Sequence, residues 1–506
     1  MPNRYIKKIL SANIYDVAKE TPVDRAKGLS QRLQNNVLIK REDLQPVFSF
    51  KLRGAYNCLR SLSADERAAG VVTASAGNHA QGLALAAKHL DVQATIVMPK
   101  TTPEIKVNAV RSFGATVVLH GDGFPDAYAH SLKLVDKQGY VYIHPFDNDE
   151  VIAGQGTVAV ELMRQITDIN AVFVPVGGGG LIAGMAVYLK YLNPAISVIG
   201  VEPEDACCLK AALQAGERVI LPEVGIFADG VAVAQIGERP FALAQQYVDE
   251  VITVTTDELC AAIKDLYDDT RAITEPAGAC SVAGLKKYVA REQVTEQNLV
   301  AIASGANINF DRLRHVAERA EIGERREAII AARIPEQPGS FKTFCQALGD
   351  RNVTEFNYRY ADQKSAQVFV GVQLTANGGG REELLTELAS ANIQAQDLSD
   401  NEMAKIHIRY MVGGHAQVAN EVVYRFTFPE RPGALMKFLT KLGQNWNISM
   451  FHYRNHGSAY GRVLVGLQVP PEDKSRLLGY LQELGYAFQE ETDNLAYQLF
   501  LSPSSK

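Results

Sequence analysis

The chain has 506 residues and lacks the features that would place it in a membrane, on nucleic acid or outside the cell. No stretch approaches the roughly 18 unbroken apolar residues that a membrane-spanning helix needs. The formal net charge is only −6, which provides no electrostatic attraction for DNA or an anionic membrane. The N-terminal segment MPNRYIKKILSANIYDVAKE lacks the apolar core and cleavage site of a signal peptide. We therefore expect a cytoplasmic protein with no nucleic-acid or membrane partner.

Cysteine is scarce, and its spacing does not suit a metal. The six cysteines form no C-x-x-C pair and no cluster with zinc-ligand spacing; they are Cys58, Cys207, Cys208, Cys260, Cys280 and Cys345. Buried, small, apolar side chains in a reducing compartment account for them. The sequence therefore predicts no metal centre built from cysteine.

Short apolar runs alternate with longer helical patterns over the first 320 residues. The β-rich runs are residues 70–74, 94–98, 117–119, 141–143, 171–176 and 197–201. Short strands separated by longer helices indicate βαβ units and a parallel sheet. The sequence predicts an α/β fold, with residues 1–320 as one large, two-lobed unit.

The rest of the chain contains an internal repeat. The matching pairs are IPEQPGSF at 334–341 with FPERPGAL at 428–435, FNYR at 356–359 with FHYR at 451–454, and VGVQL at 370–374 with VGLQV at 465–469. The offset is 94 for the first pair (428 − 334) and 95 for the others (451 − 356 and 465 − 370).

Each copy reads strand, Pro-Gly turn into a helix, strand, strand, helix, strand, with first helices expected at 340–348 and 434–442. We expect a connector at 321–328 and two α+β modules at 329–410 and 411–506. Their sheets either pack against each other or pair edge to edge. The modules contain no repeated catalytic set, so they are inert scaffolds or, as we favour, sensors of a small molecule.

Two motifs in the first 320 residues indicate amine and carboxylate chemistry. Lys51 lies in an apolar setting at the predicted head of a helix, where lost hydration and the positive helix end favour a neutral, nucleophilic amine. The segment 73–82 (TASAGNHAQG) ends a strand and opens a helix, so its backbone N–H groups can bind a carboxylate. Taken alone, Lys51 reads as a surface lysine and the segment as a helix cap.

Two further motifs indicate a phosphate and a ring. Gly177, Gly178, Gly179 and Gly180, followed by Leu181, lie between an apolar strand and a helix, where successive N–H groups can bind one phosphate. The absence of a following Lys-Ser/Thr pair excludes a Walker A loop. Ser304 ends another apolar run and could bond a ring nitrogen. An amine, a carboxylate site, a phosphate site and a ring-nitrogen partner together suit pyridoxal 5'-phosphate acting on an amino acid.

These motifs, with EPAGA at 275–279 and the two modules, resemble the biosynthetic threonine ammonia-lyases (threonine dehydratases) over nearly the whole chain. The resemblance implies a fold-type II, tryptophan-synthase-β-like catalytic domain followed by two ACT-like regulatory domains. Lys51 would form the Schiff base, Asn78 would bond the ring hydroxyl, and Ser304 would face the pyridine nitrogen. The full implied cofactor set is Phe50, Lys51, Asn78, Gly177, Gly178, Gly179, Gly180, Leu181 and Ser304. The implied substrate set is Ser75, Ala76, Gly77, Asn78 and His79.

The activity that the resemblance implies is β-elimination from L-threonine, and also from L-serine. The products from threonine are 2-oxobutanoate and ammonia, in the first step of isoleucine biosynthesis. Lys51, Ser75, Asn78 and Ser304 would be the catalytic residues, with the Lys51 amine removing the Cα proton. A serine hydroxyl leaves the ring nitrogen mostly neutral, and this favours prompt elimination over transamination.

Family likeness also implies regulation and assembly. Isoleucine would inhibit and valine would oppose it, with Tyr358 and Tyr453 at the effector positions, in a homotetramer. Serine racemases carry a divalent cation after a Val-Glu-Pro segment, and here Glu202 and the Ala206 carbonyl could be ligands. Cys208 replaces an acidic residue of that family, so we predict no dedicated metal.

Two other functions remain to be weighed. A degradative serine/threonine dehydratase or a racemase of the same fold would resemble only residues 1–320, and the C-terminal repeats favour the regulated biosynthetic enzyme. A catalytically idle amino-acid sensor is the second alternative. The intact set of Lys51, Asn78, the glycine run and Ser304 argues against it.

Overall fold

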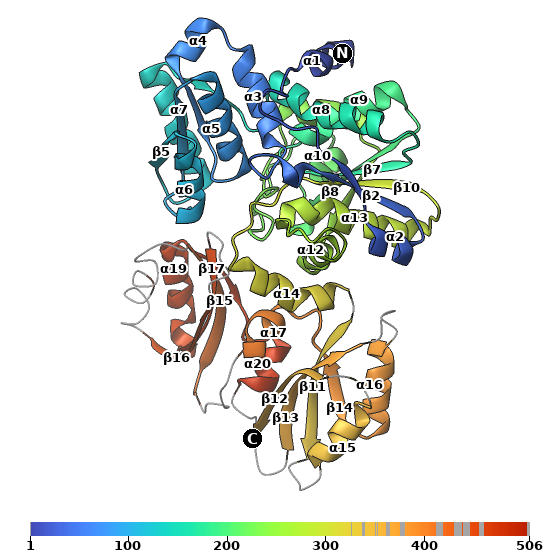
Figure 1. The fold of residues 1–506 in the computed structure, drawn as a ribbon. Helices are drawn as coiled ribbons and strands as arrows, with labels where there is room; N and C mark the ends of the chain where they lie inside the picture. Colours follow the sequence, from blue (N-terminus) through green and yellow to red (C-terminus); the bar gives the residue numbers. More distant parts are fainter. Residues whose placement is uncertain are drawn as a thin grey trace. The chain divides into compact units, whose positions relative to one another are not determined.

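The computed structural model describes residues 2–324, 326–335, 340–349, 351, 353–360, 365–374, 380–410, 418–429, 438, 446–454 and 460–502. The chain divides into two compact units, Met1–Ala320 and Glu321–Lys506 (Figure 1). No helix in the described part of the chain has both the length and the apolar character needed to cross a bilayer.

The larger sheet of the first unit has six strands. Their spatial order is β1 (Val23–Arg25), β2 (Asn36–Arg41), β10 (Asn298–Ala303), β7 (Ala171–Pro175), β8 (Ser197–Pro203) and β9 (Glu250–Val254). All neighbouring pairs are parallel except β1 with β2. Parallel strands need helices on both faces, which explains why β7 is apolar and buried along its whole length.

Two helical layers cover this sheet. On one face Val172 and Val300 pack with residues of α8 (Asp149–Gln165) and α9 (Gly180–Leu192). On the other face Phe173 and Ala301 pack with residues of α12 (Thr256–Thr270) and α13 (Pro276–Glu292). Successive residues of one strand therefore enter different cores, as the period of two requires.

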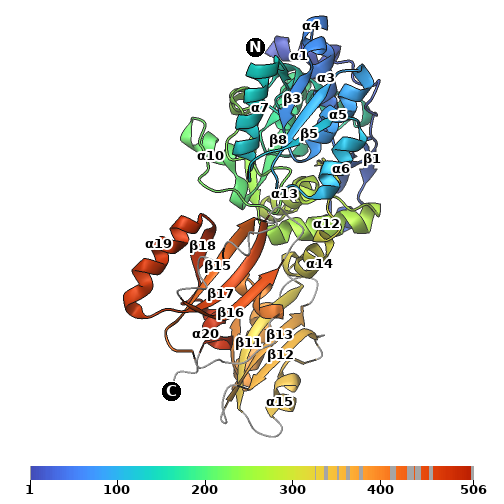
Figure 2. The same cartoon turned by 90° about the vertical axis from the view of Figure 1, so that its left-hand side faces the viewer.

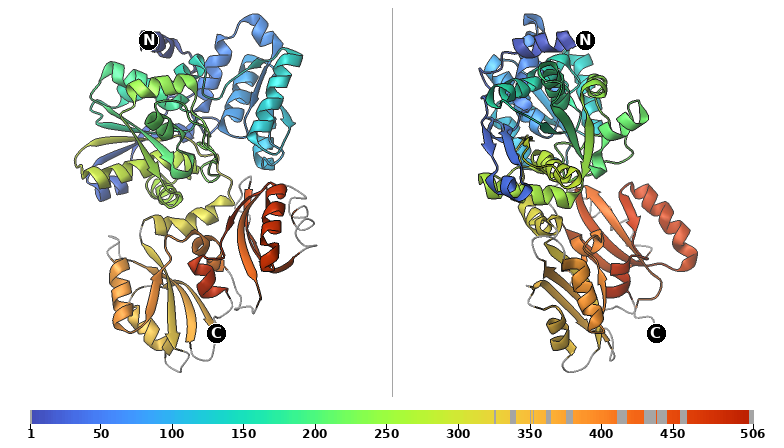
Figure 3. Two further views of the ribbon diagram at one scale, coloured as in Figure 1. Left: turned by 180° about the vertical axis from the view of Figure 1, so that it is seen from behind. Right: turned by 90° about the vertical axis from the view of Figure 1, so that its right-hand side faces the viewer.

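The smaller sheet forms a second lobe of the same unit. Its parallel strands lie in the order β5 (Thr116–Leu119), β4 (Ala94–Met98), β3 (Val71–Ala74) and β6 (Val141–Tyr142). The helices that carry most of its packing are α3 (Lys51–Ser61), α5 (Asn78–Leu90), α6 (Glu104–Ser112) and α7 (Phe124–Gln138). Figure 3 shows the two lobes, coloured mainly blue to cyan and green to yellow, from two further sides. The predicted two-lobed α/β fold is confirmed.

The remaining elements of the first unit are helices of 3 to 12 residues. They are α1 (Pro2–Ser11), α2 (Lys27–Leu33), η1 (Glu42–Leu44), α4 (Ala64–Ala69), η2 (Glu204–Ala206), α10 (Cys208–Ala215), α11 (Glu238–Tyr247) and α14 (Arg312–Gly323). The residues expected to form a connector are shared between neighbouring elements, because α14 continues to Gly323 and the next strand begins at Glu327.

The second unit contains two antiparallel sheets. The first has the order β12 (Val353–Tyr360), β13 (Ser365–Gln373), β11 (Glu327–Pro335) and β14 (Gln394–Asp397), with helices α15 (Ser340–Ala347) and α16 (Gly380–Ser390). The second has the order β16 (Asn447–Arg454), β17 (Tyr460–Gln468), β15 (Glu421–Pro429) and β18 (Ala487–Glu490), with α19 (Lys474–Leu484) (Figure 2). The first module has the predicted element order. In the second, the helix expected at 434–442 lies outside the described residues, except Phe438.

The two sheets of the second unit share one core rather than an edge. Ala331 and Phe369 of the first sheet are clustered with Val423 and Leu464 of the second. Residues of α17 (Glu402–Ile406), η3 (Ile408–Tyr410) and α20 (Leu495–Phe500) complete this cluster; another short turn, η4 (Pro471–Asp473), precedes α19. In the described part of the chain, both sheets contribute side chains to this one cluster, together with α17 and α20, and no strand of one sheet pairs with a strand of the other.

Candidate active site

The sequence motifs meet where strands of the two lobes end. Ser304 follows β10, the glycine run follows β7, and Ser75 follows β3. The segment before α3 runs directly along the Ser304 loop: Ser49 forms an isolated bridge with Gly305, and Phe50 N donates to Ser304 O at 3.2 Å. The chain therefore brings Lys51, the first residue of α3, next to the end of β10.

Lys51 has an amine prepared for covalent chemistry. Its Nζ donates a hydrogen bond to the Pro145 carbonyl at 3.1 Å and lies 5.3 Å from the centre of the Phe50 ring. Burial lowers the pKa of this amine to about 8, although the charge of Glu275 acts in the opposite direction. About one tenth of Lys51 is thus neutral, and hence nucleophilic, at pH 7, a few hundred times the neutral fraction of an ordinary lysine.

The glycine run forms a tight turn with no room for side chains. A Cβ on Gly178 would lie 2.1 Å from the Phe146 ring, and one on Gly177 would lie 2.9 Å from Val231 Cα. Gly179 has φ +87°, a conformation that favours glycine. Within the described residues, the amides of Gly178 to Leu181 donate no recorded hydrogen bond, and α9 begins at Gly180. Buried, unpaired amides at a helix N-terminus fit the phosphate of pyridoxal phosphate.

The loop from Ser75 to Gly77 is open on its outer side. A Cβ on Gly77 would meet no atom within 4 Å, and Ser75 Oγ accepts a weak hydrogen bond from Gly77 N at 3.4 Å. Ser75 N is bonded to the Val97 carbonyl at 3.1 Å, so the amides without a recorded partner among the described residues of this segment are those of Ala76, Asn78 and His79, at the start of α5. This geometry suits a carboxylate bound by backbone N–H groups.

His79 contributes differently from the rest of its motif. The residue is buried, and its Nε2 lies 3.2 Å from the Ile143 carbonyl. Burial lowers the pKa of His79 to about 3, so the ring is neutral and Nε2 carries the proton. Nε2 is engaged within the small lobe, Nδ1 is buried without a hydrogen-bond partner among the described residues, and the backbone amide remains for a ligand at the loop.

Ser304 is buried at the end of the central strand. Its Oγ donates a long hydrogen bond of 3.3 Å to the Ala277 carbonyl in the first turn of α13. With so weak a partner, the hydroxyl can also serve a ring nitrogen. Its role toward a ring nitrogen stays a prediction.

Asn78 is fixed by two residues to which the sequence assigned no role. Its Nδ2 donates to Glu275 Oε1 at 2.5 Å, and its Oδ1 accepts from Asn307 Nδ2 at 2.7 Å. Asn307 also donates to the Val47 carbonyl at 2.8 Å. The amide of Asn78 therefore has a defined orientation, with one N–H left for an oxygen of a ligand. In the sequence, the signal that could have identified Glu275 is an acidic residue directly before Pro276, at the start of an apolar helix.

Glu275 is an acid in a site that disfavours its charge. Burial raises its pKa to about 7, and the negative charge of Asp229 adds to this effect. Against the effect of burial, Lys106 and Arg312 lower the pKa of Asp229 to about 2; their nitrogens lie 2.7 and 3.4 Å from its carboxylate. One acid of the pair is thus kept ionised, while the other is poised to be protonated near neutral pH.

Glu202, the residue considered as a cation ligand, caps a helix. Its two carboxylate oxygens accept hydrogen bonds from the amides of Leu209 and Lys210 at 2.8 and 2.9 Å. These amides lie in the first turn of α10. Burial raises the pKa of Glu202 to about 7. No group of three or more His, Cys, Asp or Glu side chains suited to a metal occurs among the residues that the structure describes.

Replacing Glu275 with glutamine should change the pH dependence of stability. A carboxyl whose pKa rises from 4.5 to about 7 on folding stabilises the folded chain fully below 4.5, and this stabilisation is lost as the pH rises through 7. From about pH 5 to about pH 8, we expect the wild-type apoenzyme to lose up to about 3 kcal/mol relative to Glu275→Gln. Urea denaturation at a series of pH values measures the difference.

The control for this experiment is Glu66→Gln. Glu66 is exposed at the start of α4, where the cap formed with Ser63 lowers its pKa. Its contribution is therefore nearly constant above about pH 5.5. Parallel stability curves for the wild type and Glu275→Gln would contradict the assignment of a raised pKa to Glu275.

Comparison with protein-family models covers most of the chain. Residues 14–305 match the model of pyridoxal-phosphate-dependent enzymes. Residues 318–408 and 412–501 match the model of the C-terminal regulatory domain of threonine dehydratase. The residues at the candidate site fit this cofactor, since they provide an amine, a phosphate turn and an oriented amide.

Individual relatives agree with these matches. The chain is 56% identical over 503 residues to the biosynthetic L-threonine dehydratase IlvA of Burkholderia multivorans, covering 98% of this chain and 99% of the relative. It is 53% identical over 502 residues to the Escherichia coli enzyme of the same name, covering 98% and 97%.

Solved structures extend the likeness to the fold. The processed form of threonine deaminase isoform 2 from Solanum lycopersicum has a TM-score of 0.62 and 52% identity, covering 63% of this chain and 93% of that chain. Serine racemase from Dictyostelium discoideum has a TM-score of 0.56 and 34% identity, covering 61% and 98%. The fold is therefore that of the fold-type II enzymes, and the chain belongs to the threonine dehydratase family of pyridoxal-phosphate-dependent enzymes.

Proposed function

We propose that this protein deaminates L-threonine to 2-oxobutanoate and ammonia, as the first step of isoleucine biosynthesis. One observation carries the proposal: Lys51, with its lowered pKa, stands at the start of α3 beside the Ser304 loop. Similarity to biosynthetic threonine dehydratases over 98% of the chain supports the choice of substrate. L-Serine, which carries the same β-hydroxyl, is a second substrate.

The bound cofactor supplies an electron-withdrawing ring that makes the Cα proton of the amino acid acidic. Gly177 to Leu181 would hold its phosphate, the free N–H of Asn78 would bond the ring oxygen, and Ser304 would bond the ring nitrogen. Phe50 lies beside the Lys51 amine. The neutral Lys51 amine removes the Cα proton.

Substrate orientation falls to the open loop of the small lobe. The loop from Ser75 to His79 binds the substrate carboxylate, chiefly through the amides of Ala76, Asn78 and His79, and this fixes the Cα–H bond relative to Lys51. The Gly77 position supports this role, because nothing occupies the space above it. Ser75 supplies the one hydroxyl side chain of this loop.

The second unit regulates the first in this proposal. The ACT-like modules, assigned to 329–410 and 411–506, bind isoleucine as inhibitor and valine as its antagonist. Tyr358 and Tyr453 are the effector residues. The two tyrosines occupy equivalent strand positions in the two sheets, since Tyr358 pairs with Val368 and Tyr453 pairs with Val463. Their side chains lie outside the described residues. We also propose a cytoplasmic homotetramer.

The competing functions have less support. A degradative dehydratase or racemase of this fold does not account for two regulatory modules matched by the family model. An idle sensor does not require the lowered pKa of Lys51. Nor does it require a glycine turn whose amides, among the described residues, have no recorded hydrogen bond.

Replacing Lys51 with alanine should abolish release of 2-oxobutanoate from L-threonine. Loss of the amine removes both the covalent tether and the base, and a base alone contributes about 10²–10⁴-fold. A coupled keto-acid assay measures the loss. Lys88→Ala, which changes an exposed lysine of α5, is the control and should retain full activity. Residual activity of Lys51→Ala within tenfold of wild type would refute the assignment.

Capture of pyridoxal phosphate by the apoenzyme should follow the titration of Lys51. Only the neutral amine attacks the aldehyde, so the rate should rise with pH and level off above about 8. A free lysine side chain would level off only above about 10.4. Stopped-flow absorbance gives the rate, with Nα-acetyl-lysine, which keeps a free side-chain amine, as the comparison. A midpoint equal to that of the free amine would contradict the lowered pKa.

Replacing Tyr358 with alanine should raise the isoleucine concentration needed for half-inhibition by about 5- to 30-fold, since a hydrogen-bonded aromatic contact contributes about 1–2 kcal/mol. The maximal rate should stay within about twofold, because the catalytic residues are unchanged. Threonine saturation curves at graded isoleucine concentrations provide the test, with Tyr453→Ala measured in parallel. An inhibition curve that does not move would reject Tyr358 as an effector residue.

A further inference from the structure

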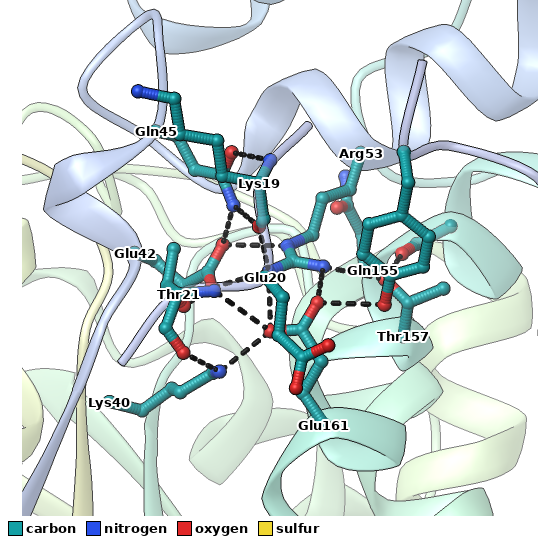
Figure 4. Close-up of polar contacts among 12 residues, drawn as sticks. Lys19, Glu20, Thr21, Lys40, Glu42, Gln45, Arg53, Gln155, Thr157 and Glu161 are labelled. Carbon is teal, nitrogen blue, oxygen red and sulfur yellow. Dashed lines mark hydrogen bonds and ion pairs between the residues drawn. The ribbon is translucent and has the colours of Figure 1, made fainter. Parts of the chain in front are cut away.

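Two residues beyond Lys51, Arg53 lies at the centre of a buried ionic cluster. We call Lys40, Glu42, Arg53 and Glu161 the buried quartet; each of these side chains is 0% exposed. Figure 4 shows Arg53 between the carboxylates of Glu42 and Glu161, with Lys40 reaching Glu161 and Thr21.

The guanidinium of Arg53 is clamped by both acids. Nε and Nη2 donate to the two oxygens of Glu42, each at 2.7 Å. Nη1 and Nη2 donate to the two oxygens of Glu161 at 2.6 and 2.9 Å. Further bonds reach Thr157 Oγ1 at 3.1 Å and the Lys19 carbonyl at 3.2 Å. A planar fork engaged on both sides has one allowed orientation.

Stability alone is a poor reason for such a cluster. Two cations and two acids are removed from water, and apolar residues of similar volume often stabilise a protein as well or better. The quartet connects four parts of the first unit: β2 through Lys40, η1 through Glu42, α3 through Arg53 and α8 through Glu161. What it provides is a defined position for α3 between those elements.

The backbone of α3 is also enclosed by glycines. A Cβ on Gly82 of α5 would lie 3.0 Å from Leu52 N, and one on Gly154 of α8 would lie 2.6 Å from Arg53 O. These contacts limit displacement of the helix toward α5 and α8. Rotation depends on directional bonds: Gly54 N donates to Gln155 Oε1 at 3.2 Å, Asn57 Nδ2 donates to the Glu150 carbonyl at 2.8 Å, and Arg53 makes the largest set of such bonds in the described α3.

Rotation of α3 would move Lys51 and Arg53 together. Two residues in a helix are separated by roughly 200°, so the two side chains leave opposite faces. Pro145 O is the one hydrogen-bond partner of Lys51 Nζ among the described residues. The position of the amine is therefore set by the helix more than by contacts of its own.

We infer that Arg53 is a positioning residue: its clamp on Glu42 and Glu161 sets the rotation of α3 and so aims the Lys51 amine at the reacting atoms. This inference rests on the proposed function, since the amine must meet both the cofactor aldehyde and the Cα proton. Arg53 itself does not touch either.

The test uses Arg53→Lys in the full-length holoenzyme. Lysine keeps the charge and much of the volume but loses the fork, so α3 is held less tightly. We expect kcat per bound cofactor to fall by about 10–100-fold, the cost of a small misplacement of a reacting group. The KM for L-threonine should change less than about threefold, because the carboxylate loop is untouched. The visible circular dichroism of the bound cofactor should change, and its capture by the apoenzyme should slow.

Arg319→Lys is the matched control. Arg319 is a buried arginine of α14 paired with Asp257, in the same unit and away from α3. Its replacement should lower the Tm but leave kcat and circular dichroism at wild-type values. Glu42→Gln is a second variant that keeps the Glu161 side of the clamp, and its kcat should fall several-fold in the same direction.

Two results would overturn the inference. If Arg53→Lys and Glu42→Gln lose thermal stability but keep wild-type kcat, circular dichroism and capture rate, the quartet serves the fold alone. If KM rises while kcat is unchanged, Arg53 acts on substrate binding instead. Failure of the proposed function is distinguishable, because the wild-type enzyme would then release no 2-oxobutanoate from L-threonine, whereas dichroism and capture would still report on Arg53.

Discussion

The hydrogen bond from Phe50 N to Ser304 O and the bridge between Ser49 and Gly305 join the start of α3 to the end of the central strand β10. Since β10 pairs with β2 and β7 on its two sides, its end is among the least movable points of the larger sheet. Lys51 follows immediately. The start of its helix is therefore attached to the larger sheet, although the rest of α3 packs in the smaller lobe. One backbone contact thereby joins the covalent end of the site to its ring-nitrogen end, while the direction of the Lys51 side chain still depends on the rotation of α3.

Charge is distributed so that the amine has no strong partner. His79 and His144 lie near Lys51, and burial lowers the pKa of these rings to about 3 and about 4, which keeps both neutral at physiological pH. Glu275, the acid that acts on Lys51, has a pKa raised to about 7. The full charges of the neighbourhood are instead paired with each other, as in Asp229 with Lys106 and Arg312. An ammonium held by a tight salt bridge could not serve as a nucleophile, so this separation is required by the chemistry.

Features that depend on neighbouring residues in the sequence could be predicted from the sequence alone. The alternation of short apolar runs and helices predicts the two-lobed α/β unit, and the glycine run and the repeat are visible without a structure. Glu275 and Asn307 are different: they are distant from Asn78 in sequence and acquire a role only when β10 and α13 are placed beside α5. The same holds for Arg53, whose partners Glu42 and Glu161 are 11 and 108 residues away. The choice between face packing and edge pairing of the modules also depends on tertiary packing, which the repeat alone does not specify.

The second unit separates its shared core from its proposed effector positions. The fully buried sheet residues of the core that joins the two modules come from β11, β13, β15 and β17, for example Ala331, Phe369, Val423 and Leu464. Tyr358 and Tyr453 belong to β12 and β16, which are the outermost strands of the two sheets on the side away from β14 and β18. An edge strand has backbone groups without a partner on one side and can adjust without breaking the inner ladder. A ligand bound there can therefore change the conformation of β12 or β16 while the core that holds the modules together stays intact, as a reversible regulatory response requires.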